Sequence, residues 1–131
     1  MNKLLNLIFT ALLITSCGEK KDLRVDKHSF SEPHNVRTTH LDLEINVNFE
    51  TELISGIANY TIENLTGSKE LVLDANGLRI DKITSAGKDC EYSLGTQDSI
   101  LGKALIIEIE KDANQVAIHY QSAPNAKALQ W

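Results

Sequence analysis

The stretch that decides the fold is THLDLEINVNFE, residues 39–50. Apolar and polar side chains alternate along it without a break, and a period of two residues is that of a β-strand. One face would carry Leu41, Leu43, Ile45, Val47 and Phe49, and the other His40, Asp42, Glu44, Asn46 and Asn48. Strict alternation predicts a strand whose apolar face lies on a core and whose polar face lies in water.

A second strand follows a tight turn at residues 50–52. Ile54, Ala58, Tyr60 and Ile62 share one of its faces, and Gly56 is a candidate β-bulge.

Turn residues divide the rest of the chain into further short strands. The Asn76-Gly77 pair after the apolar residues 71–73 is a strong hairpin signal. No window shows a convincing helical period. The strands expected are residues 71–73, 78–83, 90–94, 104–110 and 115–120. We therefore predict an all-β domain of about seven strands, built as a sandwich or a curved sheet.

The first residues are organised like a bacterial lipoprotein signal. Lys3 precedes an apolar run of 11 residues, 4–14. A membrane-spanning helix needs about 20 apolar residues, so this run is a signal-peptide core and not a stable span. It leads into Ile14-Thr15-Ser16-Cys17, which resembles a lipobox, with cleavage between Ser16 and Cys17 and a lipid on the Cys17 thiol. The alternative is an ordinary signal peptide that happens to contain a cysteine.

This organisation predicts three segments: a signal peptide over residues 1–16, a lipid-anchored polar tether over residues 17–36, and a β domain over residues 37–131. Cleavage before Cys17 removes 16 of the 131 residues, which leaves a chain of 115 and therefore one domain at most. We expect a membrane-anchored lipoprotein that faces the periplasm or the cell exterior.

Charge and cysteine content narrow the class of protein. The chain has 18 acidic and 13 basic residues, and loss of Lys3 changes its formal net charge from −5 to −6. An acidic chain argues against a nucleic-acid partner and offers no polybasic patch for anionic lipid, so attachment would depend on the acyl chains. With Cys17 lipidated, Cys90 has no second thiol for an intramolecular disulfide.

The residues that often carry chemistry are scattered. The histidines are His28, His34, His40 and His119. Their spacing matches no zinc motif, and strand histidines on a polar face are usually solvated. Asp42 and Glu44 lie on the solvent-facing side of one predicted strand. Paired carboxylates on such a face are common in any acidic sheet and do not by themselves indicate catalysis. Cys90 shares a strand face with Tyr92 and Leu94, which is expected to face the core, so we predict a buried, inert thiol. Asn64 begins a glycosylation sequon that has no expected role in a bacterial-type lipoprotein. We predict no catalytic and no metal-binding residue in this chain.

Five segments carry a more specific resemblance. They are HSFSEPHNVRTTHLDLEINVNFE (28–50), ISGIANYTIEN (54–64), LVLDANGLRI (71–80), LGKALIIEI (101–109) and YQSAPNAKALQW (120–131). In order and spacing they resemble the start of the leukotriene A4 hydrolase-like zinc aminopeptidases of peptidase family M1. The most specific pieces are residues 39–43, 71–74 and 128–131.

The resemblance implies a saddle-like N-terminal β domain that packs against a thermolysin-like catalytic domain. In that family a Gln-Ala pair, a Gly-x-Met-Glu-Asn segment, a His-Glu-x-x-His helix and a downstream Glu follow the stretch that ends here with Trp131. No catalytic or metal residue is therefore carried over, and Trp131 is expected to be the point where a longer protein was cut. The implied parent is a zinc metallo-aminopeptidase, which removes N-terminal residues from peptides by means of a zinc-activated water. Zinc is expected in the parent and no cofactor in this fragment.

The alternative is a complete small lipoprotein whose immunoglobulin-like sandwich binds a protein or a sugar. A truncated domain should leave an open sheet edge and an apolar patch near Trp131, whereas a complete sandwich should cap its edges.

Overall fold

The computed structural model describes residues 26–123, Ala126 and Leu129. Along this part of the chain there are eight β-strands and no helix, so the predicted all-β class is confirmed. The strands are β1 (Val36–Asn48), β2 (Leu53–Asn64), β3 (Glu70–Ala75), β4 (Leu78–Ser85), β5 (Lys88–Asp89), β6 (Tyr92–Leu94), β7 (Lys103–Glu108) and β8 (Gln115–Ser122). About seven strands were expected, and the additional one is the two-residue β5.

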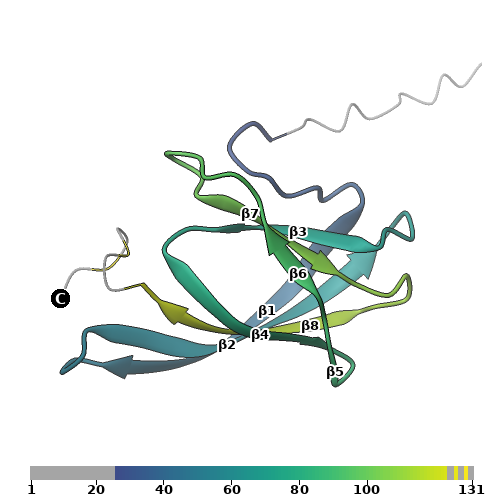
Figure 1. The fold of residues 1–131 in the computed structure, drawn as a ribbon. Helices are drawn as coiled ribbons and strands as arrows, with labels where there is room; N and C mark the ends of the chain where they lie inside the picture. The colour runs from purple at the N-terminus through teal and green to yellow at the C-terminus, as the bar shows by residue number, and fades with distance from the viewer. Residues whose placement is uncertain (1–25, 124–125, 127–128, 130–131) are drawn as a thin grey trace, which may run out of the picture.

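The strands form two antiparallel sheets. The larger has the order β1-β2-β8-β4-β5 and the smaller the order β3-β7-β6. In Figure 1 the smaller sheet lies above the larger one, and the far end of the β1–β2 hairpin extends to the left beyond it. The smaller sheet therefore covers only part of the larger sheet.

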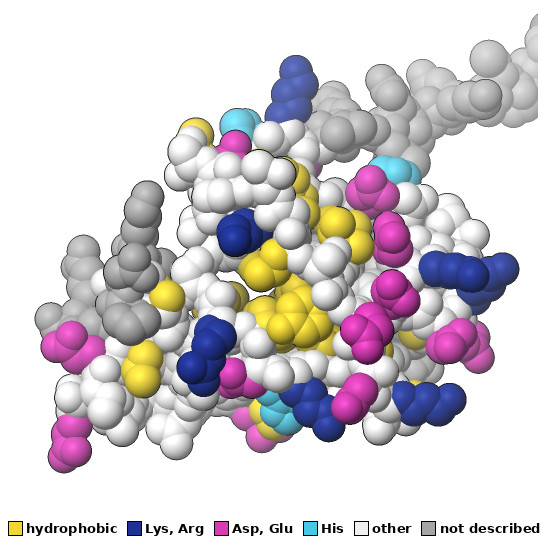
Figure 2. All heavy atoms as spheres, in the orientation of Figure 1, with side chains coloured by type: hydrophobic (Ala, Val, Ile, Leu, Met, Phe, Trp, Pro, Cys, Tyr) yellow, Lys and Arg dark blue, Asp and Glu magenta, His cyan; other side chains and the backbone are white. Residues whose placement is uncertain are grey.

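The core lies between the two sheets. Leu71 on β3 pairs with Ile107 on β7, and both side chains are almost completely buried. Opposite them the larger sheet contributes Ala58, Ile118 and Ile83, which lie side by side on β2, β8 and β4. Complete burial of such a side chain stabilises the fold by roughly 1.5–3 kcal/mol. Figure 2 shows that hydrophobic side chains also remain visible in a hollow at the centre of the face it draws.

The expectation that residues 39–50 bury an apolar face is wrong. Leu41, Leu43, Ile45 and Val47 are 42 to 53% exposed, and Phe49, just past the end of β1, is 80% exposed. The strand itself forms as predicted, but it is the edge strand of the larger sheet. The smaller sheet packs over β2, β8 and β4 instead, so along β1 the core includes only Val36.

Gly56 is not a β-bulge. It lies in regular register opposite Ile45, and the irregularity in this pair of strands falls between Thr38 and His40. A Cβ at Gly56 would overlap the carbonyl oxygen of Glu44. The glycine therefore permits a close approach of two backbones, which is the other common reason for glycine inside a strand.

The turn at Asn76-Gly77 does not close a hairpin. β3 pairs with β7 in the smaller sheet, and β4 pairs with β8 and β5 in the larger one. Gly77 adopts a φ of 68°, and the chain changes sheet at this corner, as strands in sandwiches can. The tight hairpin lies one strand later, where Ala86 and Gly87 both have positive φ, as a type I′ turn requires.

The end of the predicted tether contacts the domain. Ser29 donates its hydroxyl to Asp74 Oδ2 at 2.6 Å, and the Phe30 N–H donates to Asp74 Oδ1 at 2.8 Å. The predicted signal peptide, Ser16, Cys17 and residues 18–25 of the tether lie outside the described residues. The described residues include no helix long and apolar enough to cross a membrane.

Candidate functional site

The histidines do not come together. His28, His34 and His40 are exposed, and His119 is half-buried on β8. His40 Nε2 lies 3.2 Å from Asp42 Oδ1 on the outer face of β1. Within residues 26–123 and the two described residues beyond them, no three His, Cys, Asp or Glu side chains form a group that could hold a metal ion.

Asp42 and Glu44 both face solvent on β1, as expected from their alternation. Glu44 Oε1 accepts a hydrogen bond of 3.3 Å from Asn59 Nδ2 on β2. Asp42 borders a shallow depression of about 310 Å³ whose lining comes mostly from β2, β8 and the β4–β5 turn. Both carboxylates are exposed, and the pairing of β1 with β2 sets their positions.

Cys90 is half-buried and packs against the core, which agrees with an inert structural thiol. Burial raises its pKa above the ordinary value, and the nearby Asp89 carboxylate adds to the increase. A raised pKa lowers the thiolate fraction at neutral pH, and the thiolate is the reactive form.

A hollow of about 850 Å³ lies beside β5 and the β7–β8 connection. Acidic and basic side chains alternate around it, among them Glu70, Glu108, Lys88 and Lys111. Buried polar side-chain atoms that lack a hydrogen-bond partner do not occur in this part of the chain.

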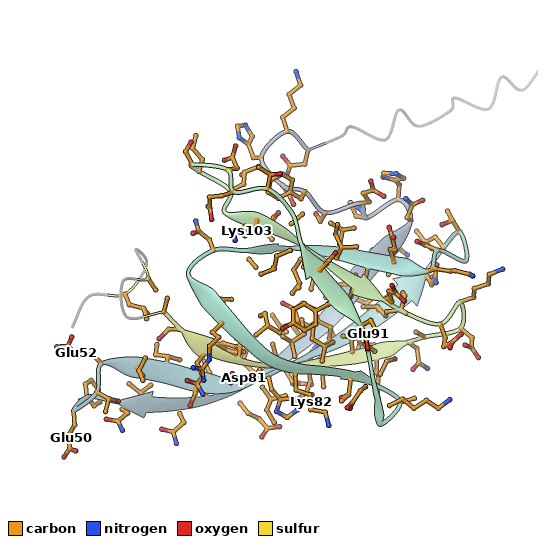
Figure 3. All side chains as sticks on the ribbon, viewed as in Figure 1. Glu50, Glu52, Asp81, Lys82, Glu91 and Lys103 are labelled. Atoms are coloured by element: carbon orange, nitrogen blue, oxygen red, sulfur yellow. The ribbon has the colours of Figure 1, made fainter. Side chains whose placement is uncertain are left out.

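The most unusual surface belongs to β1, and we call it the β1 surface. It consists of the exposed apolar row Leu41, Leu43, Ile45 and Val47 on one face of the strand, and of Asp42 and Glu44 on the other. Among the described strands β1 pairs with β2 alone, so its other edge is open. At the tip of the hairpin, Glu50 and Glu52 project away from the sheets (Figure 3).

Two structural residues were missed by reasoning from the sequence. Asn64, in the sequon, donates through Nδ2 to the carbonyl oxygens of Ser68 at 2.8 Å and Lys111 at 3.1 Å. Asp74 holds Ser29 and Phe30. An Asn just before a turn is a known local signal, because its side chain can bond nearby backbone. Asn64 contacts Lys111, and Asp74 contacts Ser29. Each contact joins segments that are distant in sequence, and no local sequence pattern predicts such a contact.

Comparison with known proteins gives consistent matches. The chain is 31% identical over 112 residues to leukotriene A-4 hydrolase of Xenopus laevis, and the match covers 81% of this chain and 18% of that protein. It is 27% identical over 116 residues to leucine aminopeptidase 2 of Yarrowia lipolytica, covering 86% of this chain and 18% of that protein. No family model matches the chain.

Solved structures share the fold. Yeast leukotriene A4 hydrolase in complex with bestatin superposes with a TM-score of 0.78 at 24% identity, over 86% of this chain and 18% of that one. An M1 zinc metallopeptidase of Deinococcus radiodurans gives a TM-score of 0.56 at 15% identity, over 71% of this chain and 22% of that one. The chain thus spans about 18% of the length of the curated relatives that it matches.

Proposed function

We propose that this chain, a relative of the N-terminal portion of the leukotriene A4 hydrolase-like aminopeptidases, is the non-catalytic β domain of a membrane-anchored zinc aminopeptidase. The resemblance predicted from the sequence is confirmed, and it carries the proposal: the match to leukotriene A-4 hydrolase runs along 81% of the chain at 31% identity. The shared all-β fold supports the same assignment.

In this proposal the chain supplies a platform and the reaction takes place elsewhere in the parent. Zinc in such an enzyme lowers the pKa of a bound water, so that the water can attack a peptide bond at neutral pH. The described residues offer no group for a zinc ion, so we assign the metal and the peptide substrates to polypeptide outside this chain. The platform is built around the buried core that contains Leu71 and Ile107.

An activity assay tests the assignment. The purified chain should release no product from an aminoacyl-p-nitroanilide and should bind no stoichiometric zinc, while a full-length leucine aminopeptidase serves as positive control. One zinc per chain together with measurable peptidase activity would overturn the proposal.

The gene offers a second test. If the parent is an aminopeptidase, the DNA beyond the codon for Trp131 should continue to encode protein, in the same frame or after a frameshift. It should encode a Gln-Ala pair, then Gly-x-Met-Glu-Asn, then His-Glu-x-x-His with a Glu downstream. A stop codon followed by no peptidase-coding sequence in any frame would favour the small binding lipoprotein instead.

Membrane attachment is the second part of the proposal. It is supported by the Ile14-Thr15-Ser16-Cys17 pattern after a short apolar run. Two or more acyl chains hold a protein stably on a membrane, whereas a single chain is marginal. A lipid on Cys17 would place the parent on the periplasmic or external side, where it could shorten peptides.

A further inference from the structure

The last part of the predicted tether is fastened to the smaller sheet by one carboxylate. Ser29 Oγ donates to Asp74 Oδ2 at 2.6 Å, and the Phe30 N–H donates to Asp74 Oδ1 at 2.8 Å. Ser29 Oγ also accepts a hydrogen bond of 3.0 Å from the Ser31 N–H. Ser29, Phe30 and Ser31 are half-buried, whereas residues 26–28 before them are exposed. Both oxygens of Asp74 therefore hold this point of the chain.

A second set of contacts fastens the other end of the same segment. The Asn35 carbonyl oxygen accepts from the Leu65 N–H at 2.8 Å, and Asn35 Oδ1 accepts from Thr66 Oγ1 at 3.2 Å. Leu65 and Thr66 lie in the connection between β2 and β3, and Val36, directly after Asn35, is buried in the core. We call residues 29–35 the strap, and Figure 1 shows it as part of the purple segment that leads into β1. The strap is thus held at two separate places on the domain.

The two fastenings differ in chemistry. Hydrogen bonds to a carboxylate are shorter and roughly twice as strong as those between neutral groups, and the contacts of Asn35 with Leu65 and Thr66 are of the neutral kind. Among the described residues the ion pairs involve carboxylates other than Asp74, so its hydrogen-bond partners are those of the strap. Asp74 itself has a fixed place, because it lies on β3 opposite Ala104 of β7. The contact at Asp74 is therefore the one that a single substitution can open.

We propose that the strap fixes the place where the N-terminal segment leaves the domain, and that Asp74 is the latch that keeps the strap closed. While the latch is closed, the chain leaves the domain at Ser29, beside β3. When the latch opens, the contacts at Asn35 remain, and residues 29–34 are added to the tether. The strap therefore gives the tether two lengths, and the state of one carboxylate contact selects between them.

The strap would set the reach of a membrane anchor, and this step rests on the proposed lipid at Cys17. With the latch closed, residues 17–28 precede the first fastened residue, and they span at most about 40 Å when fully extended. With the latch open, residues 17–34 precede Asn35 and span at most about 60 Å. The closed strap thus holds the domain nearer to the bilayer and limits the directions in which it can turn.

Hydrogen exchange on the full 131-residue chain, measured at single amides by NMR, tests the latch. The Phe30 amide should exchange slowly in the unmodified chain, because it is bonded to Asp74 Oδ1. Asp74→Ala removes both acceptor oxygens, so exchange at Phe30 and Ser31 should become at least about tenfold faster. Exchange in the core strand β7 should stay the same, which shows that the domain remains folded.

Matched variants separate the latch from a general effect of charge. Asp81→Ala removes an exposed carboxylate of β4 that contacts Arg79 and not the strap, so exchange at Phe30 should not change. Asp74→Asn keeps the size of the side chain and one acceptor oxygen, and it should accelerate exchange at Phe30 by only about threefold. The order Asp74→Ala, Asp74→Asn, Asp81→Ala is therefore the expected order of decreasing effect.

Energy transfer to a membrane tests the change in reach. The lipidated chain is placed in phosphatidylcholine vesicles that contain an acceptor lipid, with a donor dye on Glu50→Cys in a Cys90→Ser background. Glu50 lies at the tip of the β1–β2 hairpin (Figure 3). Asp74→Ala should lower the energy transfer, because a longer tether increases the mean distance between the domain and the bilayer.

Equal exchange at Phe30 in the unmodified chain and in Asp74→Ala would overturn the proposal. Equal energy transfer in the two lipidated chains would overturn its consequence for reach. An unmodified Cys17 would contradict the membrane part of the proposed function, whereas the exchange measurements need no lipid and would still decide whether Asp74 is a latch. The two proposals can therefore fail separately.

Discussion

Replacement of Ile107 by alanine tests where the core lies. Ile107 is completely buried on β7, opposite Leu71 of β3 and Tyr92 of β6. The change removes three buried carbon atoms at about 0.8 kcal/mol each, or about 2.4 kcal/mol of transfer free energy. The cavity left behind raises the cost, because substitutions of this kind in cores span about 2–5 kcal/mol. We expect the free energy of unfolding to fall by about 3–4 kcal/mol.

Ile45→Ala is the matched control. Ile45 has the same side chain in a strand of the other sheet, but it is 53% exposed. Only about half of the transfer term is lost and no closed cavity forms, so the expected cost is about 1 kcal/mol. Both changes replace a β-branched residue in a strand, so the difference in β-propensity is common to the two variants.

Urea unfolding of the full chain, followed by far-UV circular dichroism, measures both losses through the midpoint and the slope. Similar losses for the two variants would refute the reasoning, because Ile45 would then be as buried in solution as Ile107. Repetition of the measurement at several protein concentrations shows whether association of chains is the cause of such a result.

Three further outcomes follow from single residues. Gly56→Ala should cost about 1–3 kcal/mol in the same unfolding assay, because its Cβ would meet the Glu44 carbonyl oxygen; no loss would mean that β1 shifts freely. Burial and then Tyr120 raise the pKa of Tyr60 above its ordinary 10.0, so the unfolded chain loses this proton first. Stability should therefore decline above about pH 10, and Tyr60→Phe should reduce that decline in urea midpoints measured against pH. Mass spectrometry should find an acylated Cys17 at the mature N-terminus, and Cys17→Ala should block processing; an unmodified N-terminus elsewhere would contradict the lipoprotein assignment.

Local sequence determined where the strands lie. The alternation over residues 39–50 predicted β1, and six further predicted strands correspond to β2, β3, β4, β6, β7 and β8. A strand's period of two is a property of the extended backbone, so it can be read without knowledge of any partner. The two-residue β5 was missed because its pairing with β4 depends on the turn at Ala86 and Gly87, which the local pattern shows only weakly.

The resemblance to the leukotriene A4 hydrolase-like aminopeptidases also came from the sequence, and the relatives confirm it. It depended on several segments in order, such as residues 39–43 and 71–74. The candidate residues His40, Asp42 and Glu44 added nothing to the resemblance, because they lie on the exposed polar face of β1. The lipid on Cys17 stays a prediction.

Only the tertiary structure decided which strands pair and which faces are covered. The Asn76-Gly77 turn indicated a hairpin, yet β3 and β4 lie in different sheets, because β3 pairs with β7 and β4 pairs with β8, both distant in sequence. The row from Leu41 to Val47 has the pattern of a buried face and is exposed, since an alternating strand specifies which side chains share a side but not what packs on that side. Burial requires a second layer, and here the smaller sheet lies over β2, β8 and β4 and leaves β1 at the open edge.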